Sequence, residues 1–433
     1  MKKKVTIFWF RRDLRLEDNV GLFHSLQSNF PVLPIFIFDT NILKQLNTKK
    51  DRRVHYIHQA LTKINKQLQK NGASLNTFFG NPDEIFKNLY NKFDIQTIYC
   101  NHDYEPESIK RDNDINNFFN SKKIPFKTFK DQVIFEKNEI VKKDGNHYTI
   151  YTSYKKKWLE KLTHIDYQIF KYKLTNFVKQ KPVNIHTLNE IGFENTDMKY
   201  KNHKLDAKII ENYEKYRDYP AKQITSNLGI ALRFGTISIR HCVAFALQHS
   251  LCWLSELIWR EFFMQILYHY PYVINQAFKS KYDFIEWRNN EIEFELWCNG
   301  KTGFPLVDAG MRQLNETGFM HNRVRMVAAS FLCKELLIDW KWGEAYFAQK
   351  LNDFELSSNN GNWQWVAGTG CDSVPYFRIF NPSIQIDRFD KDLEYIRKWL
   401  PEFETEKYIK PIVNHNEARE RALKVYNKIV KGK

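Results

Sequence analysis

The sequence predicts two domains of different class, an α/β domain followed by an all-helical domain. In the first 130 residues, short apolar runs rich in β-branched and aromatic residues alternate with segments in helical spacing. Such alternation predicts a parallel sheet with helices on both faces, of Rossmann-like type. Beyond about residue 200 the apolar segments are too long for strands, and no repeat period appears. We therefore expect an α/β domain over 1–130, a linker over 131–195 and an all-helical domain over 196–433.

Four short apolar runs are the expected strands of the first domain, at residues 5–10, 32–38, 75–79 and 95–100. The clearest helix between them has apolar residues at alternating spacings of three and four, which predicts one buried face. Its members are Val54, Ile57, Leu61, Ile64 and Leu68. Parallel sheets bind ligands at the carboxyl ends of their strands. The chain lacks a Gly-x-Gly-x-x-Gly pattern, so we predict no dinucleotide site of that type.

The middle of the chain is basic and the second half is apolar in long segments. Residues 131–195 carry scattered prolines and many lysines, three of them in a row at 155–157. A charge run is usually a solvated surface, so we expect a linker with a basic face. The segments 251–268 and 324–337 are rich in apolar residues. They are too long for strands and predict helices of the second domain.

Charge and cysteine usage restrict the class of protein. The chain has 433 residues, a formal net charge of +16 and a pI near 9.3. Such a surface attracts anionic partners such as nucleic acid, although an acidic membrane or solubility alone also accounts for the charge. The six cysteines form no Cys-x-x-Cys pair and no metal-ligand spacing, which favours a reducing compartment and no metal site. No apolar run reaches the ~18 residues of a membrane span. We therefore expect a cytoplasmic protein.

The stretch NNGNWQW at 359–365 is the most informative piece of the chain. Two tryptophans, Trp363 and Trp365, stand beside three asparagines and a glycine. This mixture of rigid aromatic walls and short amides suits a pocket for a flat ring system with polar edges. The alternative is an aromatic core, because aromatic side chains dominate core burial.

Two helical faces combine aromatic and polar side chains. Glu256, Trp259 and Arg260 lie at three- and four-residue spacing, which places them on one face. A carboxylate beside aromatics is an unusual core residue, because burial of an unpaired charge is costly. The alternative is an ion pair between Glu256 and Arg260 at the rim. Asn322, with Arg325 and Met326, forms a similar face that indicates a ligand surface; the alternative is a partly exposed helix end.

Two further polar groups complete the candidate site. The segment 225–229 offers hydroxyls and backbone N–H groups ahead of an apolar run, which suits either a phosphate cradle at a helix start or plain helix capping. Asp353, Glu355 and Asn359 lie just before the tryptophans. We expect Arg325 to pair with Asp353 inside the pocket.

Several longer motifs resemble the photolyase/cryptochrome family, and specifically the class I DNA photolyases that repair cyclobutane pyrimidine dimers. They run in family order over nearly the whole chain. They are FWFRRDLRLEDN at 8–19, YEKYRDYP at 213–220, TSNLGIALRFGTIS at 225–238, ELIWREFF at 256–263, GKTGFPLVDAGMRQLNETGFMHNRVRM at 300–326, NNGNWQW at 359–365 and PYFRIFNP at 375–382. The fold implied by the resemblance, an α/β antenna domain and a helical FAD domain, agrees with the pattern analysis.

The resemblance implies a bent FAD in the helical domain and a second, antenna chromophore. The residues that match the FAD-binding positions are Tyr213, Thr225, Ser226, Asn227, Leu228, Gly229, Arg325, Asp353, Glu355 and Asn359. Gly229 stands where a serine is usual, which removes one hydroxyl. Folate is in doubt as the antenna, because Glu107-Ser108 replaces the Asn-Glu pair of folate-binding members. The antenna chromophore can be a folate, a deazaflavin or another flavin, and a site without any antenna is the remaining alternative.

The resemblance also implies light-driven repair of dimer-containing DNA by electron transfer from reduced FAD to a dimer flipped out of the duplex. The positions that match contacts to the dimer are Glu256, Trp259, Asn322, Met326 and Trp365. Those that match the electron-transfer chain are Trp287, Trp340 and Trp363. The positions that match contacts to the DNA backbone are Arg217 and Arg378.

Three positions distinguish branches within the family. The (6-4) photolyases have histidines where this chain has Asn322 and Met326, and plant and insect cryptochromes have aspartate or cysteine where it has Asn359. These residues favour a dimer photolyase, which we expect to act as a monomer. The alternative is a cryptochrome-type blue-light photoreceptor without repair activity.

Overall fold

The computed structural model describes residues 1–200, 204–222 and 224–431. The chain forms two compact units, each assembled from three stretches of sequence. Unit 1 comprises Met1–Glu139, Glu160–Leu205 and Asn227–Gln248, and unit 2 comprises Ile140–Leu159, Asp206–Ser226 and His249–Lys433. The boundaries expected near residues 130 and 195 stay a prediction.

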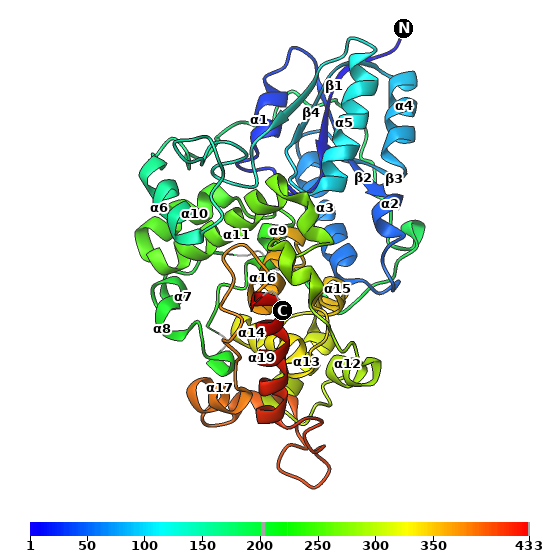
Figure 1. Cartoon of the computed structure of the whole chain (residues 1–433). Helices are drawn as coiled ribbons and strands as arrows, with labels where there is room; N and C mark the ends of the chain where they lie inside the picture. The colour runs from blue at the N-terminus through cyan, green and yellow to red at the C-terminus, as the bar shows by residue number, and fades with distance from the viewer. Residues whose placement is uncertain (201–203, 223, 432–433) are drawn as a thin grey trace. The chain divides into compact units, whose positions relative to one another are not determined.

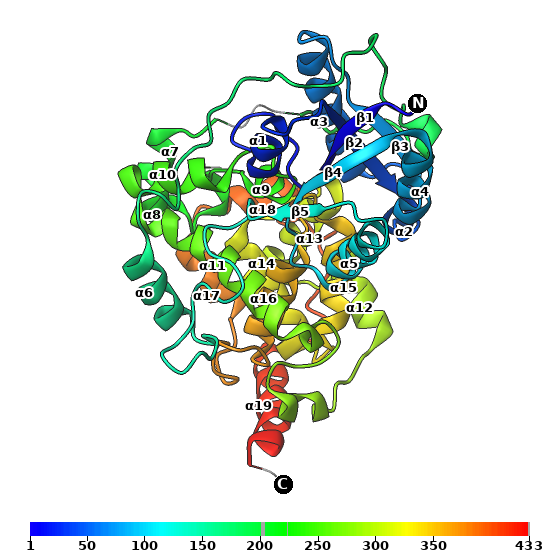
Figure 2. The same cartoon turned by 90° about the horizontal axis from the view of Figure 1, so that it is seen from above.

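Unit 1 contains a five-stranded parallel sheet of order β3-β2-β1-β4-β5 (Figures 1 and 2). The central strand, β1, has Ile7 paired with Leu33 on one side and Ile98 on the other. The strand bounds are β1 Lys4–Phe10, β2 Val32–Asp39, β3 Asn76–Gly80, β4 Asp94–Asn101 and β5 Phe126–Phe129. The predicted α/β class is confirmed, and β5 is a strand that the sequence analysis missed.

Helices cover both faces of this sheet because β1 and β2 are apolar on both sides. Ile7 and Trp9 belong to a core with α4 and α5, whereas Phe8 and Phe10 belong to a second core with α1 and α3. Strands that are buried on both faces have continuous apolar runs, as these do. The helix bounds are α1 Val20–Leu26, α2 Thr40–Leu43, α3 Arg52–Gln69, α4 Pro82–Lys92, α5 Pro106–Asn120, α9 Gly229–Arg233 and α10 Ile239–His249.

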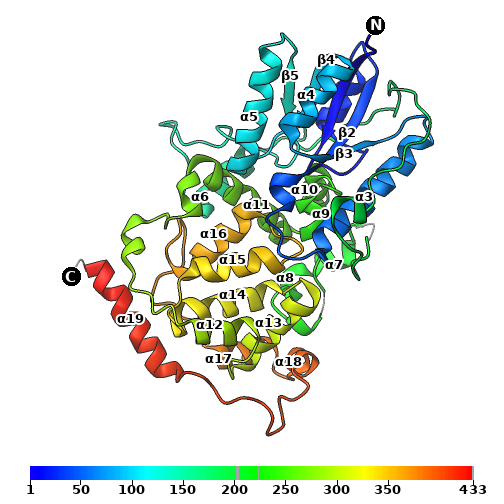
Figure 3. The ribbon, with the colours of Figure 1, turned by 90° about the vertical axis from the view of Figure 1, so that its right-hand side faces the viewer.

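Unit 2 is built on long helices, as the sequence predicts, and α13 to α16 lie side by side at its centre (Figure 3). Helix α16 contacts α11, α14 and α15. The helix bounds are α6 Tyr151–Lys161, α7 Ala207–Glu211, α8 Tyr213–Tyr216, α11 Leu251–His269, α12 Glu291–Cys298, α13 Pro305–Thr317, α14 Asn322–Ser330, α15 Trp340–Lys350, α16 Leu356–Ala367, α17 Pro382–Phe389, α18 Glu394–Trp399 and α19 His415–Lys431. Within the described part of the chain, none of the helices is long and apolar enough to cross a membrane.

A buried lysine follows α14, in a π-helical turn at Phe331–Glu335. Lys334 Nζ donates to the carbonyl of Ala367 at 2.8 Å and lies 3.6 Å from the ring centroid of Tyr426. Its burial lowers the pKa of Lys334 from 10.5 to about 7. Between those two values the unfolded chain binds more protons than the folded chain, so the free energy of unfolding rises with pH.

We expect the titration of Lys334 to raise the free energy of unfolding by about 2 kcal/mol as the pH increases from 7 to 9. Replacement by methionine, which fills similar volume without a titrating group, removes this rise. Urea unfolding of the parent and of Lys334→Met at both pH values measures the difference. An equal pH dependence in the two proteins would contradict the assignment.

Candidate functional site

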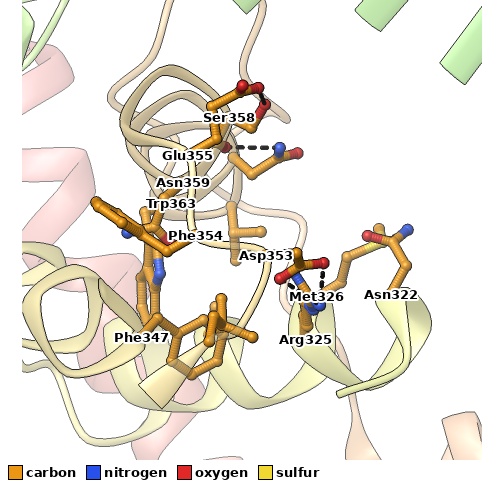
Figure 4. A pocket seen from close by; sticks show the side chains of 14 residues that line it. Asn322, Arg325, Met326, Phe347, Asp353, Phe354, Glu355, Ser358, Asn359 and Trp363 are labelled. Atoms are coloured by element: carbon orange, nitrogen blue, oxygen red, sulfur yellow. Dashed lines mark hydrogen bonds and ion pairs between the residues drawn. The ribbon is translucent and has the colours of Figure 1, made fainter. Parts of the chain in front are cut away.

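A cavity in unit 2 is lined by α14, α16 and the turn between α15 and α16 (Figure 4). The polar part of its wall is an ion pair, in which Arg325 Nη2 donates to both carboxylate oxygens of Asp353 at 3.0 and 3.2 Å. Arg325 Nε donates to the carbonyl of Met320 at 2.7 Å, which fixes the guanidinium plane. The pair thus places a fixed dipole at the cavity wall.

Helix α16 supplies the amide and hydroxyl side chains of the same cavity, at Ser358, Asn359 and Asn362. Asn362 is four residues from Ser358 and three from Asn359, so its side chain lies beside both on the helix surface. Asn359 Nδ2 donates to the carbonyl of Glu344 at 3.0 Å and to its Oε1 at 2.7 Å. Burial raises the pKa of Glu344, which favours its neutral form beside the amide.

The aromatic part of the wall is Trp363, which is only 3% exposed. Its ring meets Phe347 edge-on, with centroids 5.0 Å apart, and Trp297 at 6.2 Å. A Cβ on Gly343 would lie 2.1 Å from the indole, so the absence of a side chain there allows α15 to approach α16. Trp363 is therefore held in one orientation beside the polar residues.

A second cavity, of about 260 Å³, adjoins the first. Four residues line both cavities, namely Asn322, Met326, Ser358 and Asn362. Glu256, Trp259 and Trp365 line only the second. The structure thus brings all five residues predicted to contact the lesion into one cavity.

The charged residues of the second cavity are paired across elements. Arg217 Nη1 donates to Glu256 Oε1 at 2.5 Å. Arg260 Nη2 donates to Glu355 Oε1 at 2.9 Å. Glu256 and Arg260 of α11 thus each have a charge partner on another segment, in place of the ion pair with each other that was the alternative interpretation.

Trp259 is held by a residue that the sequence analysis missed. The ring of Tyr151 stacks on it with centroids 3.6 Å apart and planes at 8°, and the Tyr151 hydroxyl donates to the carbonyl of Ser255 at 2.7 Å. Tyr151 lies at the start of α6, in the segment interpreted as a linker. The apolar spacing of Tyr151, Tyr154 and Trp158 was the signal that could have identified it.

The remaining predicted residues lie as follows. Tyr213, in α8, has the Arg217 guanidinium carbon 5.2 Å from its ring centroid. Trp340 is buried at the start of α15, and Trp287 is half-buried with its ring 6.2 Å from that of Tyr426. Arg378 is exposed.

The segment predicted to hold the flavin phosphates is divided between the two units. Thr225 and Ser226 belong to unit 2, whereas Asn227, Leu228 and Gly229 belong to unit 1. Asn227 has a positive φ of 50°, and Gly229 is the first residue of α9. Their role toward the flavin stays a prediction.

The donor set of the first cavity fits a flavin. Ligand pockets combine mostly apolar walls with a few placed polar groups. Here Phe347, Phe354 and Trp363 supply the apolar wall. The Arg325–Asp353 pair and the amides of Asn359 and Asn362 supply groups that can meet the carbonyls and ring nitrogens of an isoalloxazine.

Comparisons with known proteins agree with this geometry. Residues 6–171 match the family model described as DNA photolyase, and residues 253–407 match the one described as FAD binding domain of DNA photolyase. A deoxyribodipyrimidine photo-lyase of Escherichia coli K12 is 34% identical over 99% of this chain and 99% of its own length. A class III photolyase from Agrobacterium tumefaciens has a TM-score of 0.87 at 31% identity, with 100% of this chain and 98% of that chain covered.

An archaeal photolyase from Sulfolobus tokodaii, solved with two FAD molecules, has a TM-score of 0.82 at 33% identity, with 98% of this chain and 100% of that chain covered. Fold, adjoining cavities and matches together define a flavoprotein of the photolyase/cryptochrome class. The chain belongs to the DNA photolyase family.

Proposed function

We propose that this protein binds FAD and uses light to split cyclobutane pyrimidine dimers in DNA. The observation that carries the proposal is the pair of adjoining cavities, which share Asn322 and Met326. One cavity carries polar and aromatic groups suited to a flavin, and the other carries the residues that match contacts to a dimer extruded from the duplex. Because curated relatives over nearly the full chain are photo-lyases, the photoreceptor alternative is not favoured.

FAD, when bound and reduced, would act as the light-driven electron donor. The protein orients the cofactor and the lesion and sets the electrostatic environment around them. Arg325 and Asp353 hold the cofactor at one wall, and Asn359 holds it at another. Extrusion of a dimer costs a few kcal/mol, and less than extrusion of intact bases because the lesion is already distorted, as is known for photolyases as a class. Trp259 and Trp365 offer the extruded bases flat apolar surfaces in exchange for the lost stacking.

The polar residues of the second cavity select the lesion. Asn322 presents an amide at the N-terminus of α14, where it can donate and accept hydrogen bonds with the base edges. Met326 Sδ lies 3.8 Å from Asn322 Nδ2, which orients the amide with a soft contact. Glu256 offers a carboxylate that accepts from a pyrimidine N–H.

The direct test is repair under light. Purified protein with reduced FAD is illuminated with an oligonucleotide that contains one thymine dimer, and recovery of thymine absorbance is followed. We expect recovery under near-UV or blue light and none in darkness. Absence of recovery from protein that carries its FAD would refute the proposed function.

Tyr151 offers a prediction about the lesion cavity. Replacement by alanine removes the ring that stacks on Trp259, and we expect the affinity for dimer-containing DNA in darkness to fall about 10-fold, or about 1.4 kcal/mol. Tyr151→Phe keeps the ring and loses only the hydroxyl, so it should bind as the parent does. Fluorescence anisotropy measures both. Equal loss in the two variants would contradict a stacking role.

Three further assignments are proposals. The Sulfolobus structure with two FAD molecules supports a second, antenna chromophore in this chain, of unspecified identity. The described cysteines, all free, support a cytoplasmic location because thiols persist in a reducing compartment. We propose a monomer, and light scattering of the purified protein tests this.

A further inference from the structure

The ion pair between Arg217 and Glu256 joins two residues with separate expected roles. The family resemblance implies that Arg217 contacts the DNA backbone and that Glu256 contacts the damaged bases. In the structure, however, Arg217 Nη1 donates to Glu256 Oε1 at 2.5 Å. While this contact persists, the carboxylate oxygen is occupied and the guanidinium charge is largely neutralised. Neither residue is then fully available to DNA.

The neighbouring charges are bound to other partners. Asp218, the next residue after Arg217, accepts from Arg323 Nη2 at 2.7 Å. On α11, Arg260 donates to Glu355 at 2.9 Å. These pairs keep Asp218 from competing for Arg217 and Arg260 from competing for Glu256. The two residues therefore have each other as principal charge partners.

The pair is accessible to a ligand. The side chains of Arg217 and Glu256 are 25% and 31% exposed, and both line the second cavity. The guanidinium also contacts the ring of Tyr213, at 5.2 Å from its centroid, and Cys252 Sγ, at 3.5 Å. These contacts can hold Arg217 in place when Glu256 releases it.

We propose that lesion binding exchanges the partners of this pair. Arg217 passes from Glu256 to a DNA phosphate, and the released Glu256 carboxylate accepts a hydrogen bond from an N–H of the extruded pyrimidine. The inference rests on the proposed function and assigns a specificity role to the pair. Loss of the ion pair is offset only when both new partners arrive together.

Undamaged DNA offers a phosphate but no free base edge. Its pyrimidine N–H groups are occupied in base pairs, so a released Glu256 would stay unpaired beside an incoming phosphate of the same charge. Arg217 should therefore stay with Glu256 on undamaged DNA. Phosphate contacts do not distinguish damaged from undamaged DNA. While Arg217 stays paired with Glu256, undamaged DNA gains one phosphate contact fewer than damaged DNA.

The salt dependence of binding counts phosphate contacts, because each contact contributes about −0.9 to the slope of log K against log salt on duplex DNA. We would measure this slope in darkness, by fluorescence anisotropy, on a dimer-containing duplex and on the matched undamaged duplex. Arg217→Gln should make the slope shallower by about 0.9 on damaged DNA and leave it unchanged on undamaged DNA. Glu256→Gln frees Arg217 and should steepen the slope on undamaged DNA by about 0.9.

Arg378→Gln is the matched control, because Arg378 is exposed and is the other residue predicted to contact the DNA backbone. It should make the slope shallower on both duplexes alike. The exchange is overturned if Arg217→Gln acts equally on both duplexes, or if Glu256→Gln leaves the undamaged slope unchanged. Circular dichroism and FAD content of each variant confirm folding. Failure of the proposed function gives a different result, since the parent itself would then show no preference for damaged DNA.

Discussion

Replacement of Trp363 by phenylalanine is expected to abolish photoreduction of bound oxidised FAD while FAD content stays close to that of the parent. Phenylalanine keeps a ring against Phe347 and fits the space that Gly343 leaves open. It is, however, much harder to oxidise than an indole. Because Trp363 lines the first cavity, it is placed to be the first donor of the chain inferred from the family resemblance.

Absorbance at the flavin bands under blue light, with a thiol as external reductant, measures this photoreduction. Trp253→Phe is the control, because Trp253 is a buried tryptophan of α11 outside both cavities. It should photoreduce as the parent does. Chemically pre-reduced Trp363→Phe should retain most of its repair activity, since repair needs no resupply of electrons from the protein. Equal photoreduction in Trp363→Phe and parent would rule out the donor role.

The fold was predictable where the periodicity of apolar residues was strong. The central strands are continuous apolar runs, and α3 has a regular stripe, so local pattern sufficed. Strand β5 is only four residues long and has exposed Lys127 in its middle, so it lacked such a pattern. Helix α6 was missed because four of its eleven residues are lysines. Tyr154 and Trp158 are nevertheless buried and donate hydrogen bonds to Glu261.

The sequence predicted many of the residues that gather around the two cavities, but few of the contacts between them. Residues that share a helix face, such as Glu256 and Trp259, follow from spacing alone. The partner of Glu256 is Arg217, 39 positions away, and that of Asn359 is Glu344 on another helix. Such pairs depend on how helices meet, which spacing along one helix does not encode. The pairing of Arg217 with Glu256 emerged only from the structure.

Removal of the Asp353 carboxylate is expected to weaken FAD binding strongly. In Asp353→Ala the Arg325 guanidinium keeps its contact to Met320 and loses both bonds of Nη2. The proposed contacts to FAD of Asp353, and of the Arg325 that it orients, are lost together, and loss of a hydrogen-bonded charge contact across a binding interface costs about 2 kcal/mol at the lower end of the usual range. The lower end applies because the side chains are 25% and 21% exposed. FAD affinity should then fall about 30-fold.

Flavin fluorescence titration and the FAD-to-protein ratio after gel filtration measure this loss. Glu293→Ala is a matched control, because Glu293 forms a similar pair with Arg288, at 2.8 and 2.9 Å, and lines neither cavity. Its FAD affinity should equal that of the parent. If both variants lost FAD equally, general destabilisation of unit 2 would explain the loss. Retention of full affinity in Asp353→Ala would remove the Arg325–Asp353 pair from the cofactor site.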